Sequence, residues 1–141
     1  MRTAPPRGRG RTLAAVSASV YLVVLAAVLF WPQHIDSQAG PLYDVLLRVV
    51  PAAFPFGIDP TLNVVMMVPF GVILATVLPR RPLVILGVAW VVPLMAEIAQ
   101  GLFLPGRTSS AVDVAANTLG GILGAAGLAT LRRLTRRRRP E

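Results

Sequence analysis

Four long apolar stretches, separated by short polar segments, set the pattern of this chain. They cover residues 13–31, 61–78, 83–104 and 111–131. A helix needs about 20 apolar residues to cross a hydrocarbon core about 30 Å thick, so each stretch is long enough to span a membrane. The second stretch follows Asp59-Pro60, which is a typical helix start: an acid at the N-cap and proline at the first helical position. The pattern predicts an all-α polytopic membrane protein, a bundle of four transmembrane helices.

A shorter pattern occupies the segment between the first and second stretches. Its apolar residues recur at i, i+3, i+4, i+7 and i+8, while Asp44 and Arg48 lie on the other side; they are Leu42, Val45, Leu46, Val49 and Val50. This spacing predicts a short amphipathic helix, too short to span. It lies either at the membrane interface or over the mouth of the bundle.

Composition and charge agree with a membrane protein and give its topology. Only 14% of the residues are charged, whereas a soluble domain carries about 25%. The net charge is +8 and every basic residue is arginine. Twelve arginines fall on one side of a four-span arrangement and only Arg48 and Arg107 on the other; the twelve are Arg2, Arg7, Arg9, Arg11, Arg80, Arg81, Arg132, Arg133, Arg136, Arg137, Arg138 and Arg139. The positive-inside rule therefore places both termini in the cytoplasm, and arginine beside a span indicates contact with anionic lipid headgroups rather than nucleic acid.

The same pattern divides the chain into three parts. Residues 1–11 are expected to be a disordered basic N-terminus, residues 12–131 the four-helix transmembrane domain, and residues 132–141 a disordered basic tail. A cleaved signal peptide is the alternative for the first stretch, but its apolar part is longer than the usual 7–15 residues. The chain has no cysteine and one histidine, His34, which excludes disulfides and a multi-histidine metal site within one chain. No cofactor is predicted.

Glu97 is the only acid in the third apolar stretch, and it anchors the candidate site. An acid at the centre of a spanning helix costs about 2.5–3.5 kcal/mol, so polar partners are expected near it. It lies about 21 Å along its helix, in the outer third of the bilayer. The polar residues at the same depth, together with Glu97, form the predicted outward-facing pocket: Asn63, Glu97, Gln100, Arg107, Asp113 and Asn117.

Structural roles are the alternative for these side chains. Ser110-x-x-Asp113 has the form of a capping box, and Gln100 and Asn117 are able to hydrogen-bond between helices. Glu97 lies in the middle of its helix, so a capping role is excluded for it. The structural alternative for Glu97 is a salt bridge with Arg107.

A row of small residues follows in the fourth stretch: Ala116, Gly120 and Gly124. Such a row predicts close packing of helix backbones within the bundle. Dimerisation through it is the alternative, and the oligomeric state stays open.

The cluster supplies two carboxylates, three amides and one guanidinium, without a serine–histidine or cysteine–histidine pair. Three functions remain: a binding protein for an amphiphile, an acid–base or metal-assisted hydrolase or transferase, and a structural partner protein. Binding needs the fewest assumptions.

Several motifs together resemble the VanZ-like family of small bacterial membrane proteins. They are Asn63-Val-Val-Met-Met-Val-Pro69-Phe-Gly71, Glu97-Ile-Ala-Gln100, Pro105-Gly106-Arg107 and Asp113-x-x-x-Asn117-Thr-Leu-Gly120-x-x-x-Gly124. The resemblance implies a multi-pass protein of the bacterial plasma membrane, linked to teicoplanin resistance, with an envelope lipid, a cell-wall precursor or a glycopeptide antibiotic as its ligand. It implies no reaction. Family members often carry an extra acid between the arginine and the aspartate; residues 108–112 have none, which weakens the case for a metal, and no metal ligand is assigned.

Overall fold

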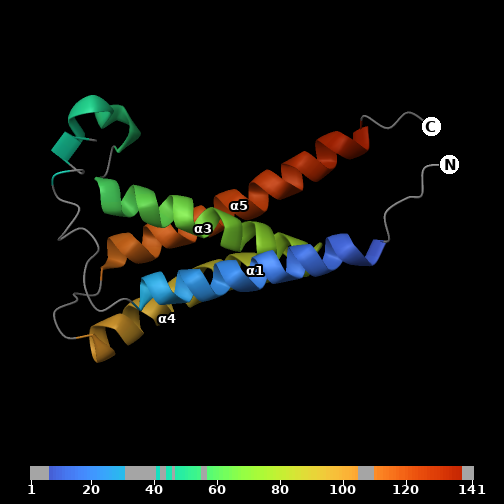
Figure 1. Ribbon diagram of the computed structural model, residues 1–141, viewed down its shortest axis with the longest axis horizontal. Helices are drawn as coiled ribbons and strands as arrows, with labels where there is room; N and C mark the ends of the chain where they lie inside the picture. The colour runs from blue at the N-terminus through green and yellow to red at the C-terminus, as the bar shows by residue number, and fades with distance from the viewer. Residues whose placement is uncertain are drawn as a thin grey trace. The chain divides into compact units, whose positions relative to one another are not determined.

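The computed structural model describes residues 7–30, 41, 44–45, 47–54, 57–104 and 110–137. Its elements are α1 (Arg7–Leu29), the 3-10 helix η1 (Pro51–Ala53), α3 (Ile58–Val77), α4 (Pro82–Phe103) and α5 (Ala111–Arg137), drawn in Figure 1. No strand occurs among the described residues. Four of these helices are long and apolar enough to cross a membrane, which confirms the predicted all-α, polytopic architecture.

The chain divides into two compact units, Met1–Trp31 and Pro32–Glu141. The first contains α1, a single continuous helix that begins at Arg7 rather than at the predicted apolar start, residue 13. Hydropathy marks where the membrane core begins, whereas the backbone ladder continues into the polar residues before it. The second unit contains the other helices and all of the candidate site residues.

The predicted amphipathic segment is helical at residues 41, 44–45 and 47–49, and Val50 lies outside the helix. Leu42 and Leu46 lie outside the described residues. Val45 and Val49, on the predicted apolar face, are 55% and 71% exposed. Their exposure leaves this face open to a membrane interface.

The start of α3 differs from its prediction. Gly57, not Asp59, is the N-cap, and Asp59 lies in the first turn. Gly57 adopts a φ of 95°, a left-handed conformation that glycine reaches without a steric penalty. The Thr61 hydroxyl donates to the Gly57 carbonyl at 2.9 Å. In the first turn, the negative charge of Asp59 still stabilises α3, because it lies at the positive end of the helix dipole.

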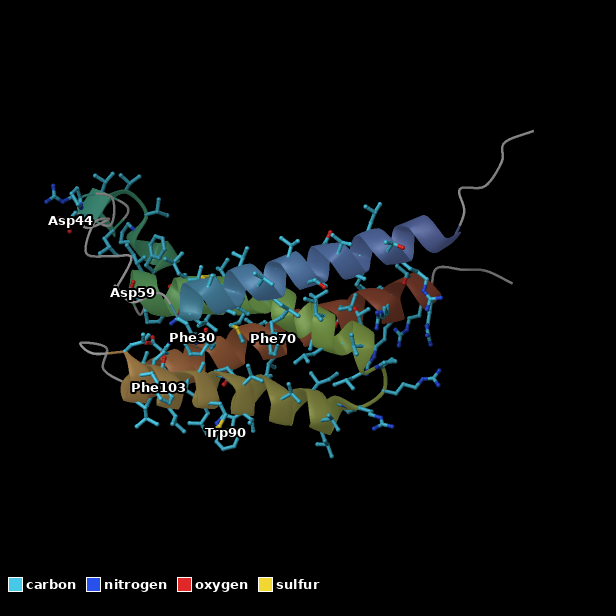
Figure 2. All side chains as sticks on the ribbon, turned by 60° about the horizontal axis from the view of Figure 1, so that its bottom comes forward. Phe30, Asp44, Asp59, Phe70, Trp90 and Phe103 are labelled. Carbon is cyan, nitrogen blue, oxygen red and sulfur yellow. The ribbon has the colours of Figure 1, made fainter. Side chains whose placement is uncertain are left out.

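Within the second unit, α3 packs most extensively against α5, α4 packs against α5, and α3 and α4 touch least. Figure 2 shows Asp59, in the first turn of α3, and Phe103, the last residue of α4, at the same end of this unit. Met67 and Phe70 of α3 are buried, as are Ala89 and Pro93 of α4. Pro69 of α3 and Pro93 of α4 both lie inside continuous helices.

Glycines make the α3–α5 contact unusually close. A Cβ built on Gly120 would overlap the carbonyl oxygen of Val64, and one on Gly124 would overlap that of Val68. A Cβ on Gly71 of α3 would in turn overlap the carbonyl oxygen of Gly121. The small-residue row therefore packs α5 on α3 within the chain, backbone against backbone.

The last helix continues beyond its predicted end at residue 131, through part of the predicted disordered tail, to Arg137. Arginine is a good helix former, and Arg132 has partners in α3. Its guanidinium donates to the carbonyl of Ala75 at 2.8 Å and to the Thr76 hydroxyl at 3.4 Å. Ala75 lies in the last turn of α3, where carbonyls lack helical partners, so this arginine caps α3 from another helix.

Candidate functional site

Glu97 reaches from α4 to the first turn of α5. Its side chain is only 6% exposed, and its Oε2 accepts a hydrogen bond from the backbone N–H of Ser110 at 2.8 Å. Ser110 immediately precedes α5. The prediction that Glu97 has no capping role is therefore wrong: a residue in the middle of one helix caps the N-terminus of the next. The N-terminal N–H groups and the helix dipole both favour a carboxylate there.

The predicted capping box of α5 is only half formed. The Asp113 backbone N–H donates to the Ser110 hydroxyl at 3.3 Å, as the motif requires. The reciprocal donor, the Ser110 N–H, is bonded to Glu97 instead. The Asp113 carboxylate accepts a hydrogen bond from the Asn63 amide of α3 at 2.9 Å. Glu97 and Asp113 thus share Ser110 as a neighbour and link all three helices of the unit.

The remaining predicted site residues lie differently. Gln100 and Asn117 are 3% and 4% exposed, on the inner faces of α4 and α5. Arg107 lies outside the described residues. The structure brings Asn63 to Asp113 and Glu97 to Ser110, and Ser110 joins the two pairs because its hydroxyl accepts from the Asp113 N–H. The close contact made by Gly120 and Gly124 is with α3, which explains why Asp113 meets Asn63.

A groove of about 690 Å³ lies between α4 and α5 and contains the Glu97 part of the cluster. It is lined by Trp90, Leu94, Glu97, Ile98, Ser110, Ala111, Val114, Ala115, Thr118, Leu119 and Ile122. Trp90 and Leu119 are 52% and 49% exposed, so the groove opens on the outside of the unit. Trp90 and Phe103 are labelled along α4 in Figure 2.

Thr118 is a site residue that the sequence reasoning missed. Its hydroxyl is buried and, within the described part of the chain, has no hydrogen-bond partner. A buried hydroxyl without a partner costs about 1–3 kcal/mol and asks for an explanation. The sequence did contain a signal that could have identified Thr118. It is a hydroxyl residue in an apolar stretch, about two helical turns after Ser110 and therefore near the same face.

This arrangement suits recognition of a ligand that donates hydrogen bonds. Its volume falls in the range of about 300–1,000 Å³ found for small-molecule sites, which are mostly apolar with a few fixed polar groups. Glu97 offers carboxylate oxygen and Thr118 a hydroxyl, while the other lining residues except Ser110 are largely hydrophobic. Among the described residues, no group of three or more histidine, cysteine or acidic side chains is placed to hold a metal ion.

The fold and this site define a multi-pass membrane protein with a buried acid at a groove between two spanning helices. Residues 18–132 match the VanZ/LLP1 family, and the chain belongs to this family. The match extends from α1 to α5 and confirms the resemblance that the motifs indicated. No curated protein and no solved structure matched the chain.

Proposed function

We propose that this protein binds an amphiphile of the cell envelope in the groove between α4 and α5. The apolar part of the ligand lies against Leu94, Ile98 and Leu119, and its polar head meets Glu97 and Thr118. The observation that carries the proposal is the buried Thr118 hydroxyl, which lacks a hydrogen-bond partner among the described residues and belongs to the same groove as the buried Glu97 carboxylate. A ligand group would satisfy that hydroxyl.

The charge of the groove narrows the class of ligand. A carboxylate accepts hydrogen bonds and repels anions, so it favours a head rich in hydroxyl, amide or amino groups over a bare phosphate. Sugar or peptide heads attached to an acyl or isoprenoid chain have this character. Teicoplanin, a glycopeptide antibiotic with an acyl chain, belongs to this class, as do lipid-linked cell-wall precursors.

The proposed location is the bacterial plasma membrane, with both termini in the cytoplasm. Its support is the distribution of arginines, which gather beside the α3–α4 turn and along the end of α5. In this orientation, Glu97, Ser110 and Asp113 face the outer leaflet, where teicoplanin and exported precursors are present.

A structural role for the cluster is the second candidate, and the hydrogen bond from Ser110 to Glu97 favours it. Removing a buried acceptor leaves a helix N–H unpaired, which costs about 1–3 kcal/mol. A purely structural cluster would lose stability and function together. A binding site would lose affinity in variants that stay folded.

The first experiment measures teicoplanin binding to the purified full-length protein in phosphatidylcholine nanodiscs by calorimetry. Thr118→Val keeps the side-chain shape and breaks no hydrogen bond in the described structure, so we expect a folded variant with about five-fold weaker binding. Thr130→Val is the matched control, because Thr130 is exposed on the same helix and does not line the groove. Vancomycin, which lacks the acyl chain, tests whether the apolar wall contributes.

Glu97→Gln separates the two candidate roles. Glutamine retains an oxygen that accepts from the Ser110 N–H but has no charge, so folding should survive while affinity falls about ten-fold or more. In cells, membrane level and teicoplanin susceptibility are scored together. Binding of neither teicoplanin nor a polyprenyl-linked precursor to the folded wild type would refute the proposal, and parallel loss of fold and protection in Glu97→Gln would establish the structural role.

A further inference from the structure

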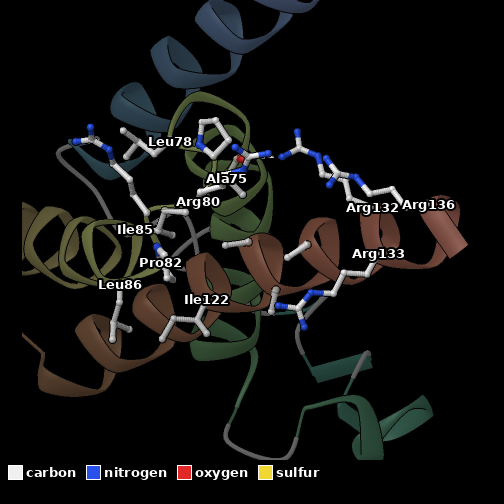
Figure 3. Close-up of a pocket in the computed structure, with 15 residues that line it drawn as sticks. Ala75, Leu78, Arg80, Pro82, Ile85, Leu86, Ile122, Arg132, Arg133 and Arg136 are labelled. Atoms are coloured by element: carbon white, nitrogen blue, oxygen red, sulfur yellow. Dashed lines mark hydrogen bonds between the residues drawn. The ribbon is translucent and has the colours of Figure 1, made fainter.

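A second cavity lies at the α3–α4 turn, away from the groove that contains Glu97. It has a volume of about 520 Å³ and is bounded by the end of α3, the start of α4 and the last turns of α5. Five arginines line it: Arg80, Arg81, Arg132, Arg133 and Arg136. The rest of the described lining is apolar, and no acidic side chain belongs to it. Figure 3 shows Arg132, Arg133 and Arg136 on one side and Leu86 and Ile122 on the other.

Three features of the chain gather these arginines. The helical continuation of α5 to Arg137 carries Arg132, Arg133 and Arg136 as a group at i, i+1 and i+4. Arg80 lies in the turn with a φ of 69°, a conformation that few residues other than glycine adopt. The hydrogen bond from Arg132 to the Ala75 carbonyl, dashed in Figure 3, fixes the end of α5 to the end of α3.

Such a concentration of positive charge favours an anionic partner. Like charges repel, and no carboxylate among the described lining residues offsets them. Guanidinium groups bind phosphate oxygens in pairs of parallel hydrogen bonds. The apolar lining continues from the charged end along the spanning helices α4 and α5, at Ile85, Leu86 and Ile122. An acyl chain extends from its headgroup into the membrane in the same way.

We infer that this cavity is a binding site for an anionic phospholipid. The phosphate of the headgroup lies among the arginines, and one acyl chain follows the apolar lining between α4 and α5. This site shares Ile122 with the proposed amphiphile groove, but its charged residues lie at the α3–α4 turn and are basic, so the two proposals are tested separately. Basic pockets between spanning helices bind anionic headgroups by the same chemistry.

The test counts lipids bound to the full-length protein by native mass spectrometry in detergent. The probes are dioleoyl phosphatidylglycerol and dioleoyl phosphatidylcholine, which share acyl chains and differ in net charge. Wild type should bind phosphatidylglycerol preferentially. The double variant Arg133→Gln/Arg136→Gln should bind phosphatidylglycerol about thirty-fold more weakly. Each arginine near a headgroup raises the affinity about five-fold, and the effects of two arginines multiply.

The control is Arg48→Gln/Arg137→Gln, which removes the same charge from residues that do not line the cavity. It should bind like wild type. Arg133→Lys/Arg136→Lys retains the charge and should keep most of the preference, and circular dichroism verifies the fold of each variant. Glu97→Gln should leave the preference unchanged, which separates this site from the amphiphile groove.

Three results would overturn the inference. One is equal binding of the two lipids by wild type, which requires no variant. Another is equal loss in the cavity variant and its charge-matched control, which would indicate a diffuse surface effect. The third is displacement of phosphatidylglycerol by inorganic phosphate at equal concentration, which would identify a free phosphate site without an acyl component.

Discussion

Gly124→Ala should separate α5 from α3 and destabilise the protein. The added Cβ would overlap the carbonyl oxygen of Val68 and lie 2.9 Å from its carbonyl carbon and 3.1 Å from the Val72 nitrogen. All three are main-chain atoms of a helix, so no rotamer change relieves the contact. The two backbones must move apart by roughly 1 Å, and a gap of that size forfeits a quarter to a half of each dispersion contact at the interface.

The magnitude follows from two opposing effects. Overpacking of this kind costs about 1–3 kcal/mol. Alanine is a better helix former than glycine by about 1 kcal/mol, but spanning helices keep their backbone hydrogen bonds in lipid even when they dissociate, so most of that gain cancels. The clash therefore dominates, and the free energy of unfolding should fall by about 1–3 kcal/mol.

Gly127→Ala is the matched control, because a Cβ at Gly127, in the same helix, meets no atom within 4 Å. Thermal unfolding of the two purified variants in detergent, followed by circular dichroism, measures the difference. We expect a lowered midpoint for Gly124→Ala and an unchanged or raised one for Gly127→Ala. Equal midpoints would refute the close backbone contact.

Three further predictions test other parts of the structure. Asn63→Leu removes the donor to Asp113 and should lower stability by about 0.6–1.7 kcal/mol; a double-mutant cycle with Asp113→Ala in the same unfolding assay should show coupling, and additive effects would contradict the hydrogen bond. Thr118→Val removes a hydroxyl without a partner in the described residues, so the midpoint should not fall. The chain contains no cysteine, so single cysteines report topology directly: an impermeant maleimide should label Ala52→Cys in intact bacteria and Thr135→Cys only after permeabilisation, and the reverse would invert the proposed orientation.

The apolar pattern predicted the spanning helices because lipid burial depends on side-chain composition, which a sequence displays directly. It located the end of α5 poorly. Residues after Leu131 are mostly polar, so the hydropathy pattern ends there. The backbone nevertheless stays helical to Arg137, with Arg132 bonded to α3. Helix ends depend on such tertiary partners, which lie far apart in sequence.

The sequence provided candidates for the residues of the site, but it did not predict which of them contact one another. The cost of burying an acid pointed to Glu97, and depth along the spanning helices selected the other polar residues. Spacing within a helix does not reveal which residue of another helix lies opposite. For that reason two features were not predicted: the bond from Ser110 to Glu97, and a Thr118 hydroxyl with no partner in the described part of the chain.

Unequal packing within the second unit assigns its helices different mechanical roles. α3 and α5 touch backbone to backbone at their glycines and cannot slide or separate without losing main-chain contacts. α4 packs on α5 less extensively than α3 does and scarcely contacts α3, and it forms one wall of the amphiphile groove. If the groove widens for a bulky head, we therefore expect α4 to move, with Glu97 on the moving helix and Thr118 on the stationary one.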